Sequence, residues 1–384
     1  MNQFKHYFFT FLVSSFVLIV GHFSSLIYID PVNVSRFELS KNEFFIKEMR
    51  FQSAGIINKY KFDSAIVGTS MAENFNANES SDKLGGFFKN LSLTGSLLKE
   101  RNIILSYFLS QKNVKTIIIS IDGVSTVQRN RGIPINAWSF LYNSNHLDDF
   151  SLYLNRKYSP YISCHTTFKS KLSNLVFGEC PAHKIESEIE DLTEWQSAPS
   201  HNSRFGGIEK WLKHRENVQV SKSIEDINIA SDLIQRKELH VDIEPEKLFD
   251  PAEFSKNITP LIKKYPQTRF ILFFPPYSIF KYAIDAQTKL NVFSQYKDLV
   301  ESVVLETEIH PNAEVYWFGD KGFISDLANY KDLTHYKSFY NSVFLDHFHH
   351  KTSIINVKNY KELLNDLTNK ANAVDLVGFS KIFK

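Results

Sequence analysis

Two short segments far apart in the sequence carry the side chains that nucleophilic acyl transfer needs. Ser70 follows the apolar run 64–67 and the glycine at position 68. Asp332 and His335 lie near the C-terminus, three residues apart. A serine hydroxyl is a weak nucleophile, so a histidine must accept its proton and a carboxylate must orient the imidazole. The sequence therefore predicts Ser70 as the nucleophile, His335 as the general base and Asp332 as its orienting partner.

Each of these assignments has a structural alternative. Ser70 in that position is also a common helix N-cap, and a bare Asp-x-x-His pattern often occurs by chance. We expect a helix to start at Ser70, where free backbone amides would stabilise an oxyanion. We also expect Asp332 and His335 to share one face of a helical turn. His347 is the competing base, but the adjacent Asp346 would face elsewhere on a helix.

Five continuous apolar runs predict the elements that must position these residues. Continuous rather than alternating runs are typical of strands buried on both faces, as in a parallel sheet covered by helices. Helical stretches fit between them, for example at 95–111 and 254–265. The predicted fold class is α/β, with strands at residues 64–68, 87–93, 115–121, 268–274 and 313–318.

Polar or turn-forming residues follow each predicted strand. In open α/β sheets, ligands bind outside the carboxyl ends of the strands. Gly95 is therefore a candidate donor of a backbone N–H to the oxyanion, beside the N–H of Ser70. Asp122, Tyr277 and Ser278 are candidates for substrate binding. An ordinary turn is the alternative for each of them taken singly.

An uncharged, apolar N-terminal segment predicts a membrane anchor. Residues 7–29 contain no Asp, Glu, Lys or Arg, and about 20 apolar residues suffice to cross a bilayer. Lys5 precedes the segment and favours a cytoplasmic N-terminus, whereas a cleaved signal peptide is the alternative. We expect a single-pass signal anchor that holds the rest of the chain outside the cytoplasm.

The domain organisation follows from these elements. Residues 1–30 form the anchor and 31–60 a polar, partly helical connector. The α/β domain occupies 61–384, and its alternation is interrupted at about 125–250. We interpret that interval as a helical insertion packed beside the crevice.

Composition excludes several classes of function. The net charge is +2, from 44 basic and 42 acidic residues mixed along the chain, so no nucleic-acid partner is expected. No phosphate-binding glycine loop and no zinc-ligand spacing occur, and neither metal nor cofactor is expected. His347, His349 and His350 suggest a solvated helix face. Cys164 and Cys180 could form a disulfide in an oxidising compartment or remain free.

Three stretches resemble the SGNH (GDSL-like) superfamily of esterases and acyltransferases. In that superfamily the serine follows the first strand, and Asp and His share one late turn. The resemblance covers residues of about 60–125 and 250–350, and is to membrane-anchored bacterial members such as the DltD-like and alginate-acetylation groups. Here the first block reads Gly-Thr-Ser instead of Gly-Asp-Ser, and Asp122 stands where the third block usually offers an Asn side chain. The stretches that carry it are 65–75, 273–278 and 330–336.

The resemblance implies a flavodoxin-like three-layer sandwich and an extracytoplasmic enzyme that moves or removes small acyl groups, most often acetyl, on a cell-surface polysaccharide. It implies a bacterial cytoplasmic membrane location, with the catalytic domain facing the periplasm or the extracellular side. Its substrates would be an acylated glycan or acyl donor, and a membrane protein that exports acyl groups is a conceivable partner. The alternative is a catalytically inactive binding or scaffold module that keeps the fold to hold a glycan or a membrane partner.

Overall fold

Two compact units make up the structure. One combines Met1–Lys61 with Ile133–Glu190, and the other combines Phe62–Gly132 with Asp191–Lys384. The sequence predicted one insertion within a single domain, whereas the first part of that insertion belongs with the N-terminal segment. The computed structural model describes residues 2–30, 32, 34, 44–45, 48–123, 134–145, 147–154, 160, 183–184, 203–238 and 252–383. Cys164 and Cys180 lie outside them.

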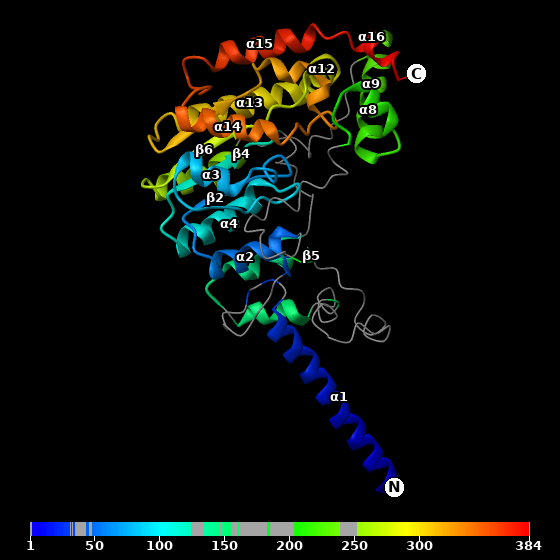
Figure 1. Ribbon diagram of the computed structural model, residues 1–384, viewed down its shortest axis with the longest axis vertical. Coiled ribbons are helices and arrows are strands. Elements are labelled where there is room, and N and C mark those ends of the chain that lie inside the picture. Colours follow the sequence, from blue (N-terminus) through cyan, green and yellow to red (C-terminus); the bar gives the residue numbers. More distant parts are fainter. Residues whose placement is uncertain are drawn as a thin grey trace. The chain divides into compact units, whose positions relative to one another are not determined.

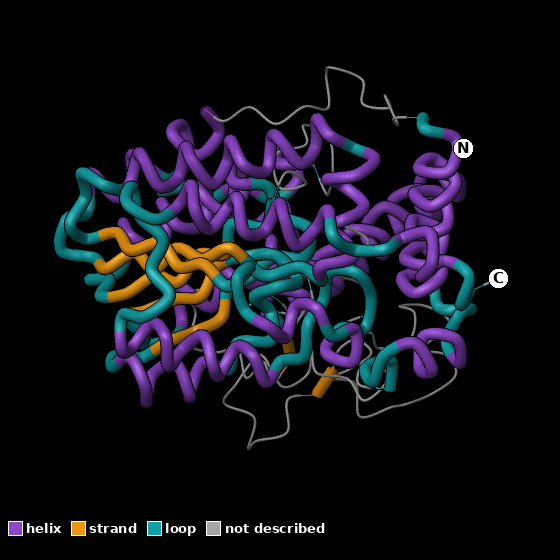
Figure 2. Tube along the Cα trace, turned by 90° about the horizontal axis from the view of Figure 1, so that it is seen from above, coloured by secondary structure: helices purple, strands orange, loops and turns teal. Residues whose placement is uncertain are grey.

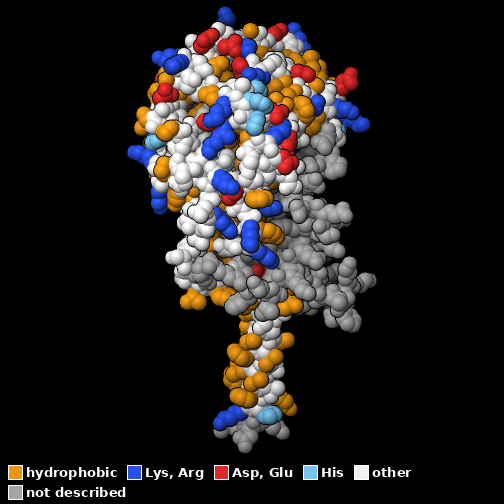
Figure 3. All heavy atoms as spheres, turned by 60° about the vertical axis from the view of Figure 1, so that its left-hand side comes forward, with side chains coloured by type: hydrophobic (Ala, Val, Ile, Leu, Met, Phe, Trp, Pro, Cys, Tyr) orange, Lys and Arg blue, Asp and Glu red, His pale blue; other side chains and the backbone are white. Residues whose placement is uncertain are grey.

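The N-terminal unit begins with helix α1 (Asn2–Ile29), dark blue in Figure 1. Its segment Phe4–Ile29, 26 residues long, is long and apolar enough to cross a membrane. Figure 3 shows hydrophobic side chains along the exposed surface of this helix. The unit also contains α2 (Met49–Lys59) and the 3-10 helices η2 (Ile135–Ala137), η3 (Ser139–Tyr142) and η4 (Asp148–Leu154), and a short antiparallel pair of β1 (Phe44–Phe45) with β5 (His183–Lys184).

A parallel five-stranded sheet forms the centre of the second unit, and all five predicted strands are confirmed. Its order is β3-β2-β4-β6-β7, and every neighbouring pair is parallel. The chain therefore moves to one side of β2 and then returns to its other side, as in doubly wound folds. The strands are β2 (Ser64–Val67), β3 (Phe88–Asn90), β4 (Thr116–Ser120), β6 (Arg269–Phe274) and β7 (Ala313–Trp317).

Successive side chains of a strand point to opposite faces of a sheet. Because every residue of β2 and β4 is buried, both faces of this sheet are covered. Ile118 and Phe273 belong to a core cluster that also includes Phe344 and Phe348 of helix α14 (Phe339–His350). On the opposite face, the rings of Phe274 and Trp317 pack against Tyr296. Tyr296 lies on α13 (Leu290–Thr307). Figure 2 accordingly shows the strands between two layers of helices.

The remaining helices connect these strands or close the C-terminal end of the chain. The predicted helix at 254–265 is divided at Ile258, because Pro260 lacks the N–H that a continuous helix needs. Further helices of the second unit are α3 (Ala77–Leu84), α4 (Leu98–Gln111), α8 (Ile208–Lys213), α9 (Val218–Arg236), α10 (Ala252–Asn257), α11 (Thr259–Lys264), α12 (Ile279–Thr288), α15 (Tyr360–Asn372) and α16 (Leu376–Ser380), with short 3-10 helices η8 (Gly322–Ser325) and η9 (Leu327–Asn329).

Candidate active site

The turn that carries Ser70 leaves the central strand β2 through Gly68. A Cβ atom at Gly68 would lie 2.1 Å from Ser120 Oγ and 2.6 Å from Ala72 Cβ, so only glycine fits between β2 and β4. Ser70 lies two residues beyond, half-buried. The prediction that a helix starts at Ser70 is wrong: turns occupy residues 70–74, and α3 begins only at Ala77. The reason is local, because Asn76 accepts a hydrogen bond from Glu79 N and caps α3 there.

The structure brings Ser70, His335 and Asp332 into one hydrogen-bonded chain. Ser70 Oγ lies 2.9 Å from His335 Nε2. On the other side of the ring, His335 Nδ1 lies 2.8 Å from Asp332 Oδ2 and 2.9 Å from Asp332 Oδ1. The side chain of His335 is 20% exposed and that of Asp332 is 5% exposed. The imidazole is thus reachable from solvent while the carboxylate behind it is covered.

The segment that carries Asp332 and His335 is a bent loop and not the helical turn that the spacing suggested. Asp332 Oδ1 accepts the backbone N–H groups of Thr334 and His335, each at 2.9 Å. Such a side-chain-to-backbone bond replaces the local hydrogen bonds of a helix. The carboxylate therefore shapes its own loop and orients the imidazole with the same oxygen atoms.

These contacts keep the Asp332 carboxylate ionised. Burial alone would raise its pKa, but the charge and ring N–H of His335, together with the two backbone N–H groups, outweigh burial. The pKa of Asp332 is held well below its usual range. The negative charge that orients and stabilises an imidazolium is therefore present at any ordinary pH.

An acid-stability experiment follows from this lowered pKa. A carboxylate whose folded-state pKa lies below the unfolded value of about 3.9 stabilises the protein above that value and loses its contribution as the pH falls through the folded pKa. We expect the free energy of unfolding to decline below about pH 4 less steeply in Asp332→Asn than in the wild type. Urea unfolding of the full chain in detergent, at several pH values, measures both slopes. Equal slopes would contradict this assignment.

Neighbouring elements hold the loop from several sides. Ser278, which caps α12, donates from Oγ to Leu333 O at 2.8 Å, and its own N–H donates to the same carbonyl. Ser223 of α9 accepts the N–H of Leu333 at 3.2 Å. Trp211 of α8 donates to Tyr330 O at 3.1 Å. The part of the predicted insertion that includes α8 and α9 thus packs directly on the loop that carries Asp332 and His335.

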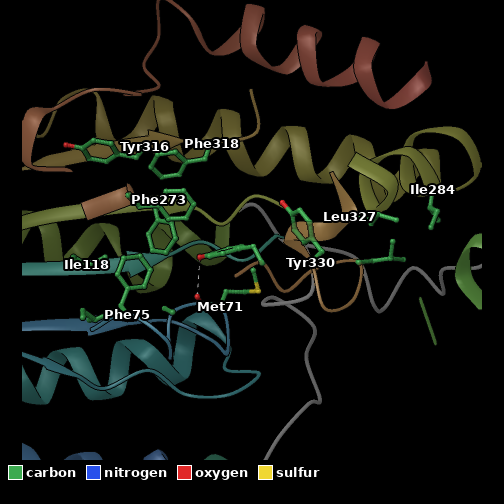
Figure 4. Close-up of a cluster of buried hydrophobic side chains, with 14 of the residues drawn as sticks. Met71, Phe75, Ile118, Phe273, Ile284, Tyr316, Phe318, Leu327 and Tyr330 are labelled. Atoms are coloured by element: carbon green, nitrogen blue, oxygen red, sulfur yellow. Dashed lines mark hydrogen bonds between the residues drawn. The ribbon is translucent and has the colours of Figure 1, made fainter. Parts of the chain in front are cut away.

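A tyrosine connects the base loop with the nucleophile turn. Tyr336 OH donates to Met71 O at 3.3 Å and to Asn341 Oδ1 at 2.9 Å. Figure 4 shows Met71 within the core cluster, beside Phe75, Phe273 and other apolar side chains. Met71, which follows Ser70, and Tyr336, which follows His335, are therefore fixed to each other through the core.

Asp122 follows β4 as predicted, but its carboxylate is bonded within the protein and only 2% exposed. It accepts hydrogen bonds from Thr69 Oγ1 at 2.7 Å, Ser120 Oγ at 2.7 Å and Arg101 at 2.8 Å. Thr69 Oγ1 in turn accepts the N–H of Met71. We therefore reassign Asp122 from substrate binding to positioning. Its carboxylate holds Thr69 directly and Met71 through the Thr69 hydroxyl, and these are the residues on either side of Ser70.

Gly95 lies in a loop that is fixed next to the nucleophile turn. Leu93 N and Ser96 Oγ both donate to Gly68 O, at 2.8 and 3.1 Å. Gly95 between them has a φ of +61°, and a Cβ there would meet nothing within 4 Å. Thr94 Oγ1 also donates to Glu73 of the nucleophile turn. A backbone donor at Gly95 thus lies at the same carboxyl end of the sheet as Ser70.

The two other predicted substrate contacts differ in accessibility. Ser278 is fully buried and bonded to the base loop, so its role is positional. Tyr277 is half-buried, and its ring lies over Gly123, where a Cβ would come within 3.2 Å of the hydroxyl. Burial and the nearby charge of Asp122 raise its pKa well above the usual value. Tyr277 remains a candidate hydrogen-bond donor for substrate.

Sequence reasoning missed two cationic residues near the carboxylate of the site. Arg204 and Lys331 are 3% and 6% exposed, and both interact electrostatically with Asp332. Burial lowers the pKa of each of them. Lys331 directly precedes Asp332, but no sequence pattern connects Arg204 with this loop. Both cations further favour the ionised form of Asp332.

The described residues contain no group of three or more His, Cys, Asp or Glu side chains placed to hold a metal ion. His347, the competing base, lies on α14, where its Nδ1 is within hydrogen-bonding distance of Thr352 and Ser353 hydroxyls. His349 and His350 of the same helix are exposed. Comparison with known proteins adds no assignment, since no protein-family model and no curated protein matches the sequence.

Proposed function

We propose that this chain is a membrane-anchored serine esterase or O-acyltransferase of the SGNH type. The observation that carries the proposal is the continuous chain from Ser70 Oγ to His335 Nε2 and from His335 Nδ1 to Asp332, at 2.9 and 2.8 Å. A binding module has no need of a serine, an imidazole and a buried carboxylate in this order. The parallel sheet places the serine after its first central strand, where doubly wound folds bind ligands.

The proposed reaction begins with attack of Ser70 Oγ on an ester carbonyl. His335 Nε2 accepts the serine proton, while Asp332 holds the Nδ1–H and stabilises the imidazolium. Backbone N–H groups near Ser70 and Gly95 are the candidate donors for the oxyanion. Collapse of the tetrahedral intermediate expels the alcohol, which takes the proton from His335 and leaves an acyl-serine.

A second half-reaction releases the acyl group. Water or a sugar hydroxyl attacks the acyl-serine, and His335 removes its proton and returns it to Ser70 Oγ. The acceptor alone distinguishes hydrolysis from transfer. From the resemblance of the motifs, we infer an acetyl group and a cell-surface polysaccharide as the substrate class, with α1 anchoring the catalytic unit outside the cytoplasm.

Labelling by a serine-directed fluorophosphonate tests this proposal. Full-length protein in detergent should form a covalent adduct, detected by mass spectrometry, because the phosphonyl group needs an activated serine. Ser70→Ala and His335→Ala should both lose the adduct. Ser110→Ala, an exposed serine on α4, is the matched control and should label like the wild type. Folded wild-type protein that forms no adduct would favour the non-catalytic binding module.

A further inference from the structure

The 3-10 helix η4 of the N-terminal unit and the residue before it carry both buried and exposed apolar side chains. Leu152 and Tyr153 are buried, at 2% and 4% exposure. Leu147, Phe150 and Leu154 are exposed, at 80%, 41% and 69%. Leu147 directly precedes η4, and the three-residue repeat of a 3-10 helix aligns it with Phe150, whereas Leu154 lies about 120° further round at the C-terminal end of the helix. We call these three residues the apolar stripe.

The buried Tyr153 of η4 is bonded to the end of α1. Tyr153 OH donates to Asp30 Oδ1 at 2.6 Å, and the same oxygen accepts the N–H of Val34 at 2.9 Å. Asp30 itself continues the last turn of α1, since its N–H donates to Leu26 O. Asp30 is fully buried. The apolar stripe is therefore held next to the residue at which α1 ends.

The length of α1 determines the depth at which Asp30 lies in a membrane. The segment Phe4–Ile29 has 26 residues, which correspond to about 39 Å of helix at 1.5 Å per residue. A hydrocarbon core is roughly 30 Å thick, so the ends of such a helix reach the headgroup region. Tyr28, 65% exposed, is the side chain expected at that boundary. Asp30 then lies at the membrane surface.

We propose that the apolar stripe inserts into the headgroup–acyl boundary of the same bilayer that α1 spans. The occupant is lipid rather than protein, because η4 is bonded to the end of α1, at the level where that helix leaves the hydrocarbon core. Figure 3 shows hydrophobic side chains beside this end of α1 as well as along it. The inference rests on the proposed membrane anchor. It gives the N-terminal unit a second, laterally displaced contact with the membrane.

The charges of the segment define the lipid preference. Residues 147–154 contain no Lys or Arg, and Asp148 and Asp149 are half-buried, with Asp148 accepting a hydrogen bond from Asn143 at 2.8 Å. Interfacial helices that need anionic lipid carry basic residues on their polar face. The stripe itself carries no basic group that would require anionic lipid, so zwitterionic phosphatidylcholine is sufficient for the test.

Spin-label accessibility in the full-length protein tests the inference. A nitroxide is attached to a non-natural amino acid at position 147, which leaves Cys164 and Cys180 untouched. The protein is placed in phosphatidylcholine nanodiscs with one chain each, so that a second copy cannot cover the label. We expect the label at 147 to lose its collisions with a water-soluble nickel chelate and to keep those with oxygen. A label at Ile309, 75% exposed in the second unit, should keep both.

Two further labels distinguish a failure of the inference from a failure of the proposed membrane anchor. A label at Phe11, within α1, should report lipid if the anchor spans the bilayer. If it does, and the label at 147 is as accessible to nickel as that at 309, the inference is overturned. If the label at 11 is itself accessible to nickel, the anchor fails and the inference fails with it. In Phe150→Glu, a label at 154 should regain access to nickel, because a carboxylate opposes insertion of the stripe.

Discussion

Replacing Asp332 with asparagine should lower kcat for p-nitrophenyl acetate by about 10⁴-fold, with little change in KM. Two hydrogen bonds carry this expectation, those from His335 Nδ1 to Asp332 Oδ2 at 2.8 Å and from His335 Nε2 to Ser70 Oγ at 2.9 Å. An asparagine amide that donates to Nδ1 places the ring proton on Nε2. The imidazole in that tautomer cannot accept the serine proton, so the first proton transfer, from Ser70 to His335, is blocked.

Thr334→Val is the matched control for this experiment. Thr334 Oγ1 also contacts His335 Nδ1, at 3.1 Å, and Asp332 Oδ1, at 3.0 Å. Its loss removes one hydroxyl hydrogen bond to the carboxylate and leaves the charge of Asp332 in place, so we expect a decrease within about tenfold. Steady-state kinetics of the full-length protein in detergent, with circular dichroism to establish folding, measures both variants. Activity of Asp332→Asn within tenfold of wild type would exclude Asp332 as the orienting group.

Replacing Asp122 with alanine should lower the free energy of unfolding by about 3–5 kcal/mol. The side chain of Arg101 is 0% exposed and that of Asp122 is 3% exposed, and their atoms are 2.8 Å apart. Removing the carboxylate leaves a buried guanidinium without its counter-ion and two hydroxyls, those of Thr69 and Ser120, without their acceptor. Urea unfolding in detergent measures the loss.

Two variants distinguish this positioning role from the substrate-binding role that the sequence suggested. Lys115→Met breaks an ion pair with Asp63 just before the same strand, where Lys115 is 66% exposed, and should cost less than about 1 kcal/mol. The double variant Arg101→Met with Asp122→Leu should recover most of the lost stability, because no charge is left unpaired. Wild-type stability of Asp122→Ala, combined with a raised KM, would restore the substrate-binding interpretation.

The sequence was sufficient to predict the sheet and the three candidate residues that the structure brings together. The strands were recognisable because runs such as 116–120 and 270–274 are apolar without alternation, which only a doubly covered sheet accommodates. Ser70, Asp332 and His335 followed from residue type and from their positions relative to those strands. Their mutual distances in the structure agree with the predicted hydrogen-bonded arrangement.

Features that depend on packing between distant segments could not be predicted from the sequence. Arg101 pairs with Asp122 from the middle of an unremarkable helical pattern, so nothing in the local sequence marks it as the partner. The turn after Ser70 is set by the cap at Asn76, which competes with a helix start at Ser70. The division of the insertion between two units depends on contacts such as that of Tyr142 OH with Arg50 O, which join segments 92 residues apart.

The separation of 265 residues between Ser70 and His335 has a consequence for the timing of activity. A chain made from its N-terminus presents the nucleophile turn early, with β2, β3 and β4 complete before β6 exists. The base arrives only with the loop after β7, and α8, α9 and α12 must already be in place to hold it. Contacts of such long range form late in folding. On the proposed function, the nascent chain carries an unactivated serine, and we expect reactivity to begin only when the C-terminal part of the polypeptide has closed onto the sheet.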